Sequence, residues 1–106
     1  MPINDKRFDQ ISNNDPKIQK ELLTLYFSTF DRALKNMTES IADNDETKWT
    51  EALHELKGAA ESLGINKVGT ICQEIEEITP PKEEKPNITN RLKEANTELA
   101  LHITGI

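Results

Sequence analysis

The chain has 106 residues, of which 13 are basic and 19 are acidic, so its formal net charge is −6 at pH 7. This charge repels phosphate backbones and anionic lipid surfaces, which argues against nucleic acid and against a membrane as partners. Hydrophobic residues make up 35% and aromatic residues 5% of the chain, a composition that suits one small all-α domain over residues 1–106 with a modest core.

Two helical segments are expected in the first half of the chain. A short one, about residues 4–11, is expected to pack Phe8 and Ile11 over one end of the fold. A long one, residues 16–42, begins with Asp15 as its N-cap and Pro16 at the first helical position. Apolar residues recur along it at steps of three and four, which is typical of a helix with one apolar stripe. They are Ile18, Leu22, Leu25, Tyr26, Phe30, Ala33, Leu34, Met37 and Ile41.

Two further helices are expected in the centre of the chain. Asp45 is expected to cap a helix over residues 46–63, which Gly64 ends in a left-handed conformation. The apolar residues of this helix are Trp49, Leu53, Leu56, Ala60 and Leu63. Asn66 is then expected to cap a helix that ends near residue 78. Its apolar residues are Val68, Ile71, Cys72, Ile75 and Ile78.

The last helix follows a loop, residues 79–86, that contains three prolines and four charged residues. Asn87 is expected to cap this helix, whose apolar residues are Ile88, Leu92, Ala95, Leu99 and Ile103. No segment alternates with the period of two that strands need. Four helices with short connections and single apolar stripes predict an antiparallel up-and-down four-helix bundle with a short extra N-terminal helix.

The sequence carries no signal for secretion or for insertion into a membrane. No apolar run approaches the roughly 20 residues of a membrane span, and the first twelve residues lack the apolar centre of a signal peptide. The single cysteine, Cys72, excludes an internal disulfide. We therefore expect a cytoplasmic protein, and Met1 with the compact length favours a free-standing protein over a domain cut from a longer one.

The stretch LHELKGAAESLG, residues 53–64, places His54, Lys57 and Gly58 within little more than one helical turn. Each residue advances about 100° around a helix, so His54 and Gly58 lie nearly opposite the apolar side and Lys57 flanks them. Glycine in the middle of a helix costs about 0.5–1 kcal/mol relative to alanine, and close core packing does not explain it on a solvent face. A missing side chain there leaves the space beside the imidazole open.

These three residues together suit the transfer of a phosphoryl group. Near pH 7 an exposed imidazole is largely neutral and keeps a lone pair on one ring nitrogen, which makes it a nucleophile. The ammonium of Lys57, three residues along the helix, can reach a group attached to the ring. Taken singly, His54 is more often an incidental surface histidine, and Lys57 an ordinary solvated lysine paired with Glu61.

At these residues the sequence resembles the histidine-containing phosphotransfer (HPt) domains of multi-step phosphorelays. Their motif reads approximately H-x-L-K-G-(A/S)-(A/S), followed by a Leu-Gly pair and an apolar pattern that ends in Leu/Ile-Glu. The matching residues are His54, Leu56, Lys57, Gly58, Ala59, Ala60, Leu63, Gly64, Val68, Cys72, Ile75 and Glu76. The match spans residues 54–76 in the two central helices.

The resemblance implies that His54 accepts a phosphoryl group from the aspartate of one response-regulator receiver domain and passes it to another receiver. It also implies that Lys57 holds the phosphoryl oxygens, that Gly58 admits the receiver, and that Cys72 only packs. Such a domain is a phosphate carrier rather than an enzyme, with no nucleotide, cofactor or metal site of its own; Mg²⁺ is expected on the receiver. The implied partners are receivers and a hybrid histidine kinase, and the implied state is a monomer.

Three other interpretations stay open at this point. The letters HELK also resemble the phosphoacceptor box of dimeric sensor-kinase hairpins, although Gly58 and Ala59 replace the usual Thr/Asn-Pro step. The phosphoacceptor domain of a chemotaxis-type kinase, phosphorylated by ATP in trans, is built on the same bundle. An adaptor bundle without phosphate chemistry would tolerate loss of His54 and gives no reason for Gly58. His102, on the last helix, is expected to be an edge packing residue.

Overall fold

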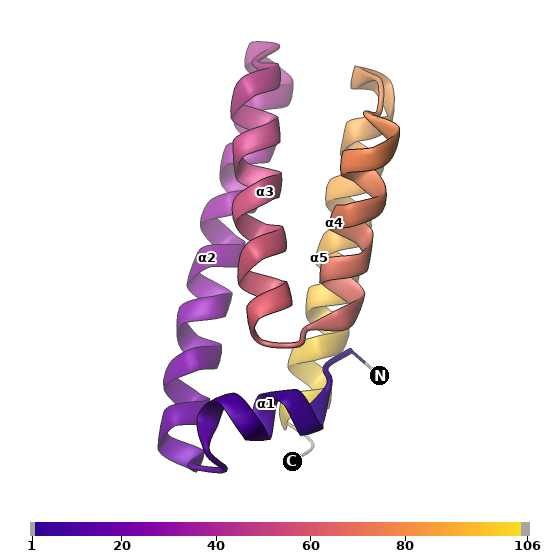
Figure 1. Ribbon diagram of the computed structural model, residues 1–106. Helices are drawn as coiled ribbons and strands as arrows, with labels where there is room; N and C mark the ends of the chain where they lie inside the picture. Colours follow the sequence, from indigo (N-terminus) through magenta and orange to yellow (C-terminus); the bar gives the residue numbers. More distant parts are fainter. Residues whose placement is uncertain (1, 105–106) are drawn as a thin grey trace.

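The computed structural model describes residues 2–104, and within them all regular structure is helical. The elements in chain order are α1 (Asp5–Ser12), α2 (Pro16–Asp43), α3 (Glu46–Ser62), α4 (Asn66–Ile78), the 3-10 turn η1 (Lys82–Glu84) and α5 (Lys85–Thr104). The long helices α2 to α5 lie side by side, and α1 crosses one end of them (Figure 1). The all-α prediction is confirmed. None of the helices in this range is both long and apolar enough to cross a membrane.

Most of the predicted helix ends are confirmed. These ends depend on local features, namely capping side chains and the backbone conformation of a glycine. The Asp15 side chain accepts a hydrogen bond from the Lys17 backbone N–H at 2.9 Å, and Asp45 caps α3 in the same way. Gly64 has a φ of +73° just after α3, and the N–H of Ile65 donates to the Ala60 carbonyl at 2.8 Å. Together these features turn the chain sharply from α3 into α4.

Two predicted N-caps are wrong. Asn66 is the first residue of α4, and the preceding position belongs to Ile65, which makes no capping side-chain bond. Ile65 is buried, so the tight turn uses that position to anchor the connection in the core. Asn87 lies inside α5, because the chain passes from η1 directly into a helix that begins at Lys85. Pro86 fits the first turn of α5, where a backbone N–H has no helical partner to lose.

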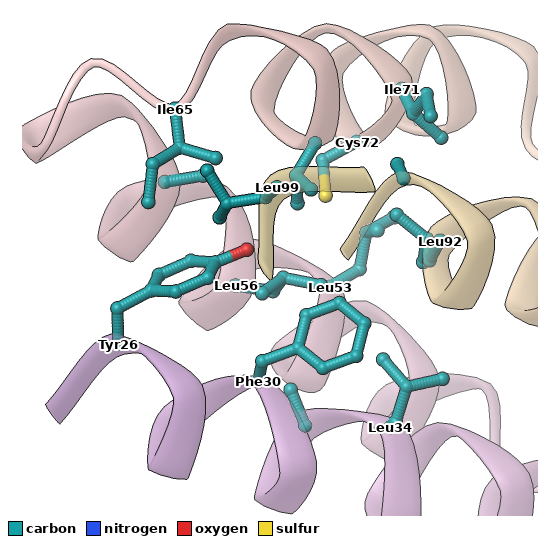
Figure 2. Close-up of a cluster of buried hydrophobic side chains, with 14 of the residues drawn as sticks. Tyr26, Phe30, Leu34, Leu53, Leu56, Ile65, Ile71, Cys72, Leu92 and Leu99 are labelled. Carbon is teal, nitrogen blue, oxygen red and sulfur yellow. The ribbon is translucent and has the colours of Figure 1, made fainter. Parts of the chain in front are cut away.

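The core is formed by apolar side chains from every α-helix. Figure 2 shows its centre, where Tyr26 and Phe30 of α2 face residues of α3, α4 and α5. The side chains labelled there are Tyr26, Phe30, Leu34, Leu53, Leu56, Ile65, Ile71, Cys72, Leu92 and Leu99, all of them buried. The one-face pattern that was predicted for each helix therefore describes most of the core.

Four residues assigned to apolar stripes are exposed instead: Ile11, Ile18, Leu25 and Ile78. Leu25 lies about 100° around α2 from buried Tyr26, and Ile11 lies about 100° around α1 from buried Ser12, so each points away from the packed side of its helix. Ile78 is the last residue of α4, and Ile18 lies in the first turn of α2. The contact surface of each helix is thus narrower and shorter than its apolar stripe.

Cys72 is expected to make the fold less stable at alkaline pH. Burial, helped by the charges of Glu76 and Glu61, raises the pKa of the Cys72 thiol to about 12. An unfolded thiol titrates near pH 8.5, so its proton stabilises the fold fully below that pH and progressively less as pH rises toward 12. We expect the free energy of unfolding to fall by about 1.4 kcal/mol per pH unit above pH 8.5.

Urea unfolding at pH 7.5, 8.5 and 9.5 measures this effect. Cys72→Ala should lower the stability at every pH but flatten the decline over this range, where tyrosine and lysine titrate little. A decline of equal steepness in both proteins would show that another group is responsible.

Candidate functional site

His54 lies in the middle of α3 with its imidazole in solvent. Its side chain is 79% exposed, whereas Leu53 and Leu56 on the same helix are buried. The two leucines fix the rotation of α3 about its axis, which turns His54 away from the core. The predicted solvent position of His54 is therefore confirmed.

Gly58 lies one helical turn after His54 and faces open space. A Cβ atom built on Gly58 would meet no atom within 4 Å, apart from its own chain neighbours and the helix backbone. Helix packing therefore does not require a glycine here, and the surface beside the imidazole is clear of side chains on this side. The predicted clearance is present in the geometry.

Lys57 is paired with a residue that the helical spacing did not indicate. Its Nζ lies 3.0 Å from Oε2 of Glu76 on α4, instead of pairing with Glu61 as the simple interpretation of the sequence expected. The hydrogen bond to Glu76 is the main cause that raises the pKa of Lys57. Both side chains are about a quarter exposed, so the groove between α3 and α4 shelters this pair better than a pair with the exposed Glu61 would be sheltered.

Glu76 also faces His54, and thereby joins the three side chains into one cluster. Its Oε1 lies 3.5 Å from Nδ1 of His54. A carboxylate on this side of the ring favours the tautomer with its proton on Nδ1. The lone pair is then on Nε2, on the opposite side of the ring from the carboxylate. The cluster thus presents a nucleophilic nitrogen to a partner in solvent.

A second ion pair, next to His54 in the sequence, joins α2 to α3. Nη2 of Arg32 is 2.7 Å from Oε1 of Glu55, the residue that follows His54. Both side chains are about half exposed, so the pair itself adds little stability. Its effect is to compensate the charge of Glu55, as Lys57 compensates that of Glu76.

The other chemistry-bearing residues lie apart from this cluster. Cys72 is buried in the core, as expected of a packing residue. His102 is half-buried near the end of α5, with Nε2 3.8 Å from Oδ1 of Asp5 on α1. Within residues 2–104, no three or more His, Cys, Asp and Glu side chains are grouped so as to hold a metal ion.

The sequence interpretation included Glu76 in a motif but did not assign it to the site. Its contact with Lys57 and His54 depends on the relative position of α3 and α4, which spacing within one helix does not determine. A usable signal existed, because Glu76 lies one turn after Cys72, whose burial in the core turns that side of α4 inward. A carboxylate at this position therefore lies close to α3.

Comparison with protein families matches the chain to the Hpt domain over residues 21–104. This range contains His54, Lys57, Gly58 and Glu76, and it leaves out α1. Searches of the curated proteins and of the solved structures each found no significant match. Hpt domains carry out histidine phosphotransfer in two-component signalling, where they interact with receiver domains and kinases. The chain belongs to the Hpt domain family.

Proposed function

We propose that this protein is a phosphorelay intermediate, which accepts a phosphoryl group on His54 from the aspartate of one receiver domain and passes it to the aspartate of another. The observation that carries the proposal is the imidazole itself, which is 79% exposed beside the open space at Gly58. An incidental surface histidine needs neither this clearance nor a paired carboxylate and ammonium at its side.

In the proposed transfer, the lone pair on Nε2 of His54 attacks the phosphorus of the phosphoaspartate. The nitrogen–phosphorus bond forms while the bond from phosphorus to the aspartate oxygen breaks, and the electron pair leaves on the aspartate carboxylate. The second receiver reverses these changes. Such reactions depend mainly on positioning and on charge stabilisation. This chain therefore acts as a carrier rather than an enzyme, and Mg²⁺ is expected on the receiver.

Lys57 is proposed to stabilise the phosphorylated state. Its ammonium lies on the helix surface one turn from His54 and is held there by Glu76 at 3.0 Å. A phosphoryl group on Nε2 would offer this ammonium new acceptor oxygens in addition to the carboxylate. Charge-assisted hydrogen bonds of this kind are roughly twice as strong as neutral ones.

The proposal extends to the organisation of the protein. We infer a single domain over residues 1–106, acting as a cytoplasmic monomer, with a hybrid histidine kinase upstream. We also infer that α2 to α5 form an antiparallel up-and-down four-helix bundle with α1 as an extra helix. This topology is supported by the short connections and by the packing of α3 against both α2 and α4 and of α5 against both α4 and α2.

The direct test is to incubate the protein with a panel of labelled, phosphorylated receiver domains and Mg²⁺, and to trap the products at alkaline pH. We expect label on this protein that is stable in alkali and lost in acid, as a phosphohistidine requires. Absence of label with every receiver, in a protein shown to be folded, would contradict the relay role. Label that appears only with ATP and a kinase would favour the chemotaxis-type interpretation instead.

Gly58→Ala separates stability from transfer. Alanine is the better helix former, and its Cβ meets open space, so we expect the free energy of unfolding to rise by about 0.5–1 kcal/mol. The same methyl group stands beside the imidazole, so we expect slower transfer from a receiver. Thermal unfolding and single-turnover transfer measure the two effects. Unchanged transfer in both Gly58→Ala and the bulkier Gly58→Leu would contradict the clearance role.

A further inference from the structure

A pocket of about 350 Å³ adjoins His54 between α3 and α4. Its apolar lining comes from Trp49, Leu53, Ile75 and Pro80, all of which are buried. His54 and Glu76 form part of its wall, so the pocket and the cluster around the imidazole share one continuous surface. This pocket plays no part in the transfer chemistry described above.

The charges around this pocket are compensated. Glu46, which also lines the pocket, forms an ion pair with Lys85. Nζ of Lys85 lies 4.9 Å from the centre of the Trp49 ring, which holds the ammonium against the indole. Glu76 is paired with Lys57. An apolar side chain can therefore enter without burying an unpaired carboxylate.

A receiver that reacts with His54 must cover this pocket. The reacting nitrogen and phosphorus must approach to about 3–3.5 Å, which brings the receiver surface around its aspartate onto the residues that adjoin His54. Covering an apolar pocket while leaving it filled with disordered water forgoes binding energy, whereas an apolar group that displaces this water gains affinity. Buried anchors of this kind carry most of the energy in many interfaces.

We propose that the pocket beside His54 binds one apolar side chain of the receiver domain, which anchors the receiver over the imidazole. This inference rests on the proposed function and names the part of the receiver that this site selects. A receiver with an acidic residue at the matching position would place its carboxylate beside Glu46 and Glu76, which also line the pocket. The pocket thereby discriminates between receivers.

The test is a substitution at the edge of the pocket whose larger side chain fills it. Thr50 is exposed on α3, lines the pocket and lies one turn before His54, so Thr50→Phe places a ring in the pocket without touching the phosphoryl-accepting nitrogen. Thr70→Phe is the matched control, since Thr70 is exposed on α4 and lines a separate cavity between α4 and α5. Each variant is assayed for transfer from the same phosphorylated receiver over a range of receiver concentrations.

We expect Thr50→Phe to raise KM for the receiver about tenfold or more while kcat stays within about twofold, as loss of uniform binding energy requires. Thr70→Phe should leave both constants within about twofold. Equal KM values for Thr50→Phe and wild type would overturn the inference and leave the relay role intact. Failure of the wild-type protein to accept any label would instead contradict the proposed function itself.

Tryptophan fluorescence supplies a readout that does not depend on transfer. Trp49 is the single tryptophan of the chain and lines the pocket. Binding of a receiver that has no tryptophan of its own should shift the emission of Trp49 in the wild type and in Thr70→Phe. Should Thr50→Phe unfold, as circular dichroism would reveal, Thr50→Leu replaces it with the same expected rise in KM. Receiver binding that leaves the Trp49 emission unchanged would contradict the anchor.

Discussion

His54→Gln is expected to accept no detectable phosphoryl group from any receiver that labels the wild-type protein. Glutamine keeps a polar side chain of similar reach but has no nucleophilic nitrogen, so the nitrogen–phosphorus bond cannot form. The exposed position of His54 allows the substitution without loss of core packing. The measurement is transfer of label from a phosphorylated receiver, trapped at alkaline pH.

Two controls make this result specific. His102→Gln removes the other histidine of the chain, which lies near Asp5 at the end of α5, and should keep the full label. The free energy of unfolding of His54→Gln should lie within about 0.5 kcal/mol of the wild-type value, as is usual for surface substitutions. Alkali-stable label on folded His54→Gln would assign the phosphoryl group to another residue and contradict the site.

Leu56→Ala is expected to have the largest effect on stability. Leu56 is fully buried at the centre of the core, between α2 and the α4–α5 pair (Figure 2). Truncation of such a leucine removes buried apolar surface and leaves a cavity, at a cost of about 2–5 kcal/mol. Because small domains are stable by only about 5–15 kcal/mol, this loss should lower the urea midpoint steeply.

Leu25→Ala is the matched control. It makes the same chemical change on α2, but Leu25 is 66% exposed, so the free energy of unfolding should change by no more than about 0.5 kcal/mol. Comparable losses in the two variants would mean that the assignment of inward and outward faces is wrong. Both are measured by urea unfolding at pH 7, where Cys72 is protonated in the folded and the unfolded chain.

The features that could be predicted from the sequence are those that depend on near neighbours in the chain. Asp15 and Asp45 cap their helices through backbone groups two or three residues away, and Gly64 ends α3 through its own backbone conformation. The exposure of His54 follows from its spacing to buried Leu53 and Leu56. All of these require only the geometry of a single helix.

The features that could not be predicted depend on how one helix lies against another. Lys57 pairs with Glu76 across the groove rather than with Glu61 one turn away, because α4 brings a sheltered carboxylate within 3.0 Å. Arg32 pairs with Glu55 across α2 and α3. The predicted N-cap roles of Asn66 and Asn87 were wrong, because the packing of the helices determines where α4 and α5 begin. Local preferences then give way to tertiary contacts.

A chase experiment decides whether His54 carries the phosphoryl group between receivers. The protein is labelled from one receiver, separated from that donor, and mixed with a second receiver and Mg²⁺, and the label on both proteins is followed over time. We predict that the label leaves His54 and appears on the aspartate of the second receiver faster than it is lost to water. Label that stays on this protein until it hydrolyses, with every receiver offered, would show that His54 does not pass the phosphoryl group on.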